Sequence, residues 1–176
     1  MYKRDSQRQA VYDAEREAFA KDCDVNYTLE ESVELMKRLL KSSVVKQLFK
    51  NANRRKPELP RIRFDQKGCP WANNTQMHLR PSFNSFWVVI HEFTHFVRNN
   101  ITSKEAYHGR EFCRTYFDLM YWFDVERGKK LRASFKKHNV KYRALPKLSA
   151  TERARRKDRF LQNIVEKAAT TEGVAE

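Results

Sequence analysis

Two histidines four residues apart, set in a strongly apolar stretch, constrain this chain more than any other feature. The sequence HEFTH at residues 91–95 directly follows the apolar run FWVVI at residues 86–90. A helix that is apolar nearly all round is buried, and residues four apart lie on one helix face. His91 and His95 are therefore expected on one face of a buried helix, where a single metal ion can satisfy both. The plain alternative is a helix with two histidines on a polar face.

The residues around this pair supply a base and a third ligand. Glu92 follows the first histidine, where its carboxylate can take a proton from a water that the metal activates. Catalytic zinc usually has three protein ligands and keeps a fourth position for water. His108 is the expected third ligand, because Gly109 follows it and allows a tight turn beside the metal. Glu105 and Glu111 are alternative third ligands.

The two histidine segments, residues 88–95 and 108–112, resemble the SprT-like zinc metallopeptidases, which include the Spartan proteases of DNA–protein crosslink repair. They are also similar to short phage-encoded metallopeptidases of the same minimal zincin type. The resemblance covers roughly residues 28–125, and the cysteine-rich zinc ribbon that often follows the SprT-like core is missing. The resemblance implies that Glu92 is the general base and that the three zinc ligands are His91, His95 and His108.

Periodicity predicts an α+β fold: a small zincin-like domain with a short antiparallel or mixed sheet packed on the motif helix, plus a basic helical C-terminal extension. The strand around Met77–Leu79 is the expected sheet edge, where a substrate peptide can pair by strand addition. A structural hairpin is the alternative. Helices are expected at 10–21 (weakly), 28–51, 84–98 and 109–123, and strands at 61–64 and 75–80.

Charge is concentrated late in the chain. Of a net charge of +14, most comes from residues 129–160, which hold thirteen Lys or Arg and two acidic residues. Such a concentration predicts binding to DNA or RNA without sequence specificity; a solvated basic surface is the alternative. The expected nucleic-acid contacts are Lys129, Lys130, Arg132, Lys136, Lys137, Lys141, Arg143, Arg153, Arg155, Arg156, Lys157 and Arg159.

Composition also predicts organisation and compartment. Four segments are expected: a polar, partly helical start (1–27), the core (28–127), the basic extension (128–169, with a helix from Thr151) and a disordered tail (170–176). The cysteines are isolated, which fits a reducing compartment, and Cys69 is the one expected to be exposed. Without an apolar leader or a membrane-length apolar run, the protein is expected to be intracellular, either cytoplasmic or nucleoid-associated.

These features together predict a zinc-dependent metallopeptidase that hydrolyses peptide bonds. Tyr107, Arg110 and Tyr116 are candidate donors to the oxyanion, and Asp118 or Asp124 is expected to orient a ligand imidazole. The alternative is a non-catalytic protein that binds nucleic acid or ribonucleoprotein, or a phage structural protein, built on the same scaffold with a structural zinc. The sequence leaves the protein substrate and the oligomeric state open.

Overall fold

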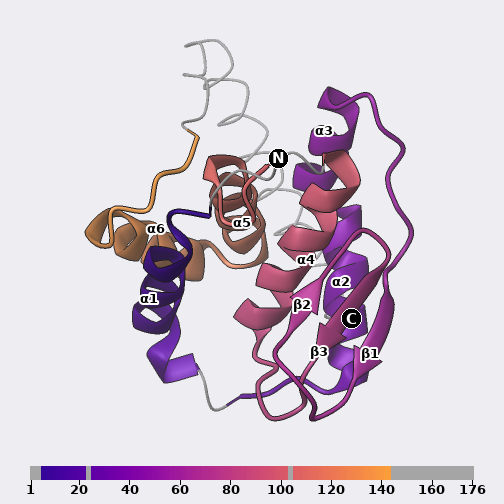
Figure 1. Cartoon of the computed structure of the whole chain (residues 1–176), viewed down its shortest axis with the longest axis horizontal. Coiled ribbons are helices and arrows are strands. Elements are labelled where there is room, and N and C mark those ends of the chain that lie inside the picture. The colour runs from indigo at the N-terminus through magenta and orange to yellow at the C-terminus, as the bar shows by residue number, and fades with distance from the viewer. Residues whose placement is uncertain (1–4, 23–24, 103–104, 144–176) are drawn as a thin grey trace, which may run out of the picture. The chain divides into compact units, whose positions relative to one another are not determined.

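The described part of the chain folds as an α+β unit in which six α-helices accompany one small sheet (Figure 1). The computed structural model describes residues 5–22, 25–102 and 105–143. The expectation of an α+β fold is thereby confirmed. In chain order the elements are α1 (Arg8–Phe19), the 3-10 helix η1 (Ala20–Asp22), α2 (Leu29–Lys41), α3 (Ser43–Asn51), β1 (Arg61–Phe64), β2 (Trp71–Ala72), β3 (Gln76–Leu79), α4 (Phe86–Ile101), α5 (Arg110–Phe123) and α6 (Val125–Lys137).

The single helix expected at 28–51 is wrong, because Ser42 divides it into α2 and α3. Thr28 begins α2 with a capping box that includes Glu31. Ser42 has extended backbone angles (φ −61°, ψ 152°), and its hydroxyl accepts a hydrogen bond from the Val45 backbone N–H at 3.2 Å. Serine favours this N-cap geometry over a helix interior. The apolar stripe runs across the break and therefore gave no sign of it.

The sheet corrects the expectation that the strand around Met77–Leu79 lies at an edge. The strand order is β1-β3-β2, so β3 is the central strand. It pairs in parallel with β1 and antiparallel with β2. The parallel pairing also excludes a simple hairpin of β1 with β3. Strand β2 is only two residues long, too short for alternation to reveal it, and it forms one edge of the sheet.

Helix α4 lies at the centre of this unit, with α5 on one side and the sheet and α2 on another (Figure 1). Residues 86–97 are all buried, as their apolar sequence predicts. Helix α6 packs closely on α5, because a Cβ at Gly128 would stand 2.6 Å from the Tyr121 Cα. Helix α1 packs in turn on α6, where the Ser134 hydroxyl donates to the Ala14 carbonyl at 2.8 Å. The compact unit ends at Arg143.

Several expectations fall on residues outside the described part of the chain. They are the helix from Thr151, the tail at 170–176 and the basic side chains Arg153, Arg155, Arg156, Lys157 and Arg159. Across the residues that are described, no helix combines the length and apolar character needed to cross a membrane.

Candidate metal centre

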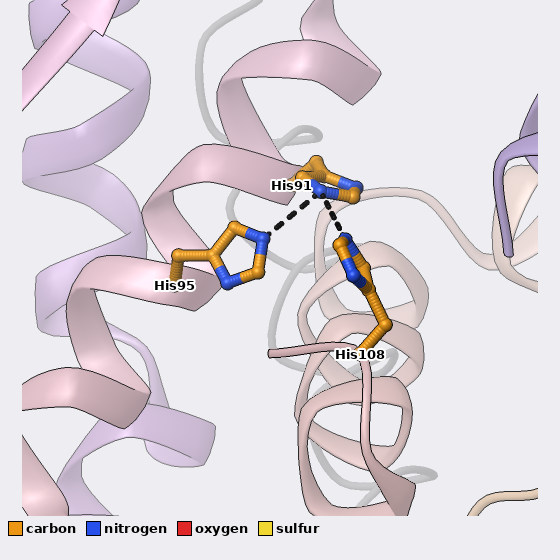
Figure 2. Close-up of side chains that lie close together, drawn as sticks. All are labelled: His91, His95 and His108. Carbon is orange, nitrogen blue, oxygen red and sulfur yellow. Dashed lines mark hydrogen bonds between the residues drawn. The ribbon is translucent and has the colours of Figure 1, made fainter. Parts of the chain in front are cut away.

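The candidate metal-binding residues come from one helix and one loop. His91 and His95 lie one turn apart on α4, and His108 lies in the loop that leads into α5. All three side chains are buried, at 3–7% exposure. Figure 2 shows the three rings turned towards one another, with His91 between the other two.

The three imidazoles present nitrogen atoms at metal-binding distances. The His91 Nε2 atom lies 3.2 Å from the His95 Nε2 and 3.2 Å from the His108 Nε2. One nitrogen from each ring lies within 4.8 Å of the others. Nitrogens held about 2.0–2.1 Å from one tetrahedral ion stand about 3.3 Å apart. The histidines therefore form a cluster that can hold a metal ion.

The alternative third ligands, Glu105 and Glu111, lie elsewhere. Glu105 forms a bidentate ion pair with Arg98. Glu111 pairs with Arg143 at 3.2 Å. Neither carboxylate belongs to the histidine cluster, so among these three candidates His108 is the one that the structure brings to the site.

Two carboxylates hold the outer nitrogens of the ligand rings. Glu15 Oε1 lies 2.5 Å from His91 Nδ1, and Asp5 Oδ2 lies 2.7 Å from His108 Nδ1. Asp5 also accepts from the His108 backbone N–H at 3.3 Å. A carboxylate that accepts the Nδ1 proton leaves the Nε2 lone pair free for a metal and makes it more basic. Both rings are thus oriented as metal ligands.

The expectation that Asp118 or Asp124 orients a ligand is wrong. Asp118 accepts two hydrogen bonds from Arg114, the shorter at 2.5 Å. Asp124 caps α6 by accepting from the Arg127 backbone N–H at 3.0 Å. Both carboxylates therefore have partners on α5 or α6. The carboxylates that contact the histidine rings, Glu15 and Asp5, come instead from residues 1–27, which were expected to be a polar, partly helical segment.

Glu15 left one signal in the sequence. It occupies the apolar face of α1, because Val11, Ala14 and Phe19 are fully buried and Glu15 itself is 1% exposed. A carboxylate on such a face requires a partner. Asp5 precedes the helix in polar sequence and left no comparable signal.

Glu92 is buried beside the cluster with an unused acceptor. Its side chain is 7% exposed, and its Oε2 atom has no hydrogen-bond partner among the described residues. Burial raises the pKa of Glu92 to about 7, although the neighbouring His91 acts in the opposite direction. A cation bound at the histidines would act in the same direction as His91 and lower the pKa of Glu92. An unpaired buried carboxylate oxygen next to three imidazoles fits a site that takes a metal ion and a water.

The pKa values of the three imidazoles shift in different directions. Burial lowers the pKa of His95 well below its ordinary value, and His91 lowers it further. Burial and His91 also lower the pKa of His108, against the opposing effect of Asp5. Burial alone would lower the pKa of His91, but Glu15 raises it above the ordinary value. The pKa of His91 is thus shifted in the opposite direction to the pKa values of the other two imidazoles.

The three candidate oxyanion donors lie in different surroundings. Tyr107 is 54% exposed, with its ring centre 5.6 Å from that of His95. Arg110 is exposed at the start of α5. Tyr116 is fully buried, its ring centre 5.5 Å from that of His91, and its hydroxyl is 3.5 Å from the Trp87 carbonyl oxygen. Burial raises the pKa of Tyr116 well above its ordinary value.

Tyr12 is a further aromatic neighbour of the cluster that the sequence did not reveal. Its ring centre lies 5.8 Å from that of His91 and 5.2 Å from that of His108. Burial raises the pKa of Tyr12, with Arg8 opposing the rise. The hydroxyl is therefore a neutral donor at physiological pH. Tyr12 lies on a helix that was expected only weakly, so nothing in the sequence linked it to the histidines.

The basic residues that are described lie on α6 and just after it. All seven expected nucleic-acid contacts within the described range are exposed. Three have acidic partners, with Lys129 paired to Glu126, Lys137 to Glu17 and Arg143 to Glu111. The other four, for which the described part of the chain shows no ion pair, are Lys130, Arg132, Lys136 and Lys141.

Comparison with known proteins adds no relative. No family model, no curated protein and no solved structure matches this chain. The chemistry of the site therefore rests on its residues and their geometry.

The buried Glu15 carboxylate gives a first prediction. We expect Glu15→Gln to weaken zinc binding by about 10- to 100-fold, because an amide accepts the His91 proton without the charge that makes the ring basic. Competition with a chromogenic chelator measures the affinity, and circular dichroism verifies the fold. Asp13→Asn, on the same helix but paired with Arg16 at 3.2 Å, is the matched control. Equal affinities in the two variants would contradict the role of Glu15.

The raised pKa of His91 predicts how metal binding depends on pH. Zinc needs the His91 Nε2 lone pair, so a proton competes for this ring below its raised pKa. We expect the affinity to fall by about tenfold per pH unit below that pKa and to level off above it. His95 and His108, whose pKa values are lowered, add competition only at lower pH. Calorimetry in buffers of different ionisation enthalpy counts the released proton; no proton release at pH 6 would refute the prediction.

Proposed function

We propose that this chain is a zinc-dependent metallopeptidase with a zincin-like fold. The observation that carries the proposal is the convergence of three buried imidazole nitrogens beside the unpaired carboxylate oxygen of Glu92. A purely structural site has no use for such a base. The likeness of residues 88–95 and 108–112 to SprT-like metallopeptidases supports the same reading.

Zinc is the metal that suits this donor set best. Three imidazole ligands are typical of catalytic zinc sites, which keep a further position for water or substrate. Hard cations such as Mg²⁺ and Ca²⁺ prefer oxygen ligands. The carboxylates Asp5 and Glu15 lie behind the rings, on their Nδ1 atoms, which is the usual arrangement around zinc-bound histidine.

The side chains divide the work of peptide hydrolysis as follows. When bound, zinc supplies Lewis acidity, which polarises the scissile carbonyl and makes a water more acidic. Glu92 accepts the proton of the attacking water and passes it to the leaving amine. Glu15 and Asp5 keep His91 and His108 in the ligating orientation. Tyr12 and Tyr107 are the exposed or half-buried donors near the cluster that can stabilise the oxyanion. Arg110 is exposed two residues after His108, and Tyr116 is enclosed and suits this role less.

The substrate backbone is proposed to pair with the edge strand β2. Residues Cys69 and Pro70, which lead into β2, line the same cavity as His91 and Glu92. An extended peptide added to this edge would be held by main-chain hydrogen bonds beside the candidate base. The sequence predicted that substrate pairs with Met77–Leu79, and we propose instead that it pairs with Trp71–Ala72.

The rival proposal is a structural zinc in a non-catalytic nucleic-acid-binding or phage structural protein. It predicts that the fold depends on the metal. A catalytic site predicts instead that a chelator removes activity while the fold remains. Thermal unfolding with and without chelator, measured beside peptide cleavage, separates the two.

Glu92 provides the most direct test of the peptidase proposal. We expect Glu92→Gln to lower cleavage of an unfolded protein such as casein by at least about 100-fold, because it removes the base. The zinc content should remain about one per chain by elemental analysis. His108→Ala should lose both zinc and activity. Proteolysis retained by Glu92→Gln would refute the mechanism.

A second activity is proposed for the basic surface of α6. A groove of about 730 Å³ is bordered by the cations Lys129, Arg132, Lys136 and Lys141, and its apolar lining includes Tyr142. Cations can bind phosphates, and the half-buried Tyr142 adds an aromatic ring on which a base can stack. We propose that this groove binds DNA or RNA without sequence specificity. The free thiols of Cys69 and Cys113 also support the proposal that the protein works inside the cell.

Salt dependence tests this second proposal. We expect the double variant Arg132→Ala/Lys136→Ala to weaken binding of a single-stranded DNA oligonucleotide and to reduce the slope of log affinity against log salt by about 1.4, which is about 0.7 for each lost charge. The control Lys46→Ala/Lys50→Ala removes the same charge from exposed positions on α3. Fluorescence anisotropy measures both. Identical slopes in the two variants would contradict binding at the α6 groove.

A further inference from the structure

A cavity of about 620 Å³ opens beside Glu92, on the side of the metal centre that faces α1. His91 and Glu92 form part of its lining. Trp87 and Val88 lie one helical turn before these two residues on the same face of α4. One helical turn is about 5.4 Å, and an extended peptide advances about 3.3 Å per residue. A side chain next to the scissile bond therefore reaches the wall that Trp87 and Val88 form.

One wall of this cavity is apolar. Pro70, Phe83, Trp87 and Val88 line it. The Trp87 ring stacks on Phe19 with ring centres 6.2 Å apart and meets Phe83 edge-on at 5.6 Å. The volume is typical of a small-molecule site and large enough for an aromatic side chain. Such a wall favours one large apolar side chain over a small one.

Two buried polar atoms in the lining residues have no protein partner. They are the Trp87 indole N–H and the Glu92 Oε2, neither of which has a hydrogen-bond partner among the described residues. Buried polar groups are nearly always satisfied, so each points to a ligand or water.

Three arginines, Arg8, Arg16 and Arg80, add positive charge to the lining. All three are exposed, and within the described residues no ion pair involves Arg8 or Arg80. The acidic lining residues, Glu15 and Glu92, are buried, and Glu15 is held by His91. Charge complementarity therefore favours a carboxylate on the incoming peptide.

We propose that this cavity selects peptides in which an acidic residue neighbours a large apolar residue at the scissile bond. The apolar side chain packs between Pro70, Trp87 and Val88, and the carboxylate binds the arginines. This assignment rests on the proposed peptidase function and names its substrate class.

Three peptides of one sequence, differing only at the centre, test the proposal. They carry Glu-Phe, Glu-Ala or Lys-Phe. With zinc-loaded Glu92→Gln protein, which does not cleave, we expect Glu-Phe to bind at least about tenfold more tightly than Glu-Ala and several-fold more tightly than Lys-Phe, by fluorescence anisotropy. The wild type should rank the peptides in the same order by kcat/KM. Equal binding of all three would overturn the proposal.

Two variants tie the preference to this cavity. Arg80→Glu should remove or reverse the preference for Glu-Phe over Lys-Phe, whereas Arg55→Glu, an exposed site outside the cavity, should not. In a Cys23→Ser background, a bulky maleimide on the exposed Cys69 should block Glu-Phe binding and leave zinc bound; Cys69→Ser should resist the reagent. The assignment would be overturned if Arg80→Glu kept the preference for Glu-Phe over Lys-Phe and labelled Cys69 left Glu-Phe binding unchanged.

The outcomes separate this inference from the proposed function. Cleavage without any preference among the peptides would retain the peptidase and discard the selective cavity. The predicted binding order without cleavage by the wild type would retain the cavity as a peptide site and discard the peptidase.

Discussion

The hydrogen bond between His91 and Glu15 is the interaction on which the centre of this protein depends. Both side chains are nearly fully buried, and a charge on either one alone would be strongly unfavourable there. Each satisfies the other by a hydrogen bond, which lets α4 bring polar groups into an otherwise apolar core. The same bond fixes the His91 ring, and His95 and His108 are arranged around that ring.

This pair also explains why α1 belongs with the metal centre. The helix has a modest apolar face, and by itself it would be a weak helix in water. Its position is fixed by buried Val11 and Phe19, by the Ser134 contact to Ala14 and by the Glu15 carboxylate. Packing and one buried polar contact therefore supply the stability that local propensity lacks.

The sequence was most informative where one residue type had one physical role. The spacing of His91 and His95 in an apolar run located both the buried helix and two histidines of the cluster, and Gly109 marked His108. The features that the sequence did not predict depend on contacts between distant segments. Nothing local distinguishes Asp5 from other exposed acids, and a two-residue strand such as Trp71–Ala72 is defined only by its partner. The break at Ser42 was missed because a helix cap and a helix interior can carry the same apolar stripe.

The contact of α1 with α6 has a consequence for the order of assembly. The residues that meet there are about 120 positions apart, as in the contacts of Ala14 with Ser134 and of Glu17 with Lys137. During synthesis, α1 leaves the ribosome long before its packing partner, and at about 5–20 residues per second the delay is several seconds. Because α1 is weak by itself, we expect Glu15 to reach His91 only after that packing has formed. The histidine cluster would then be completed late in folding, after α4 has formed.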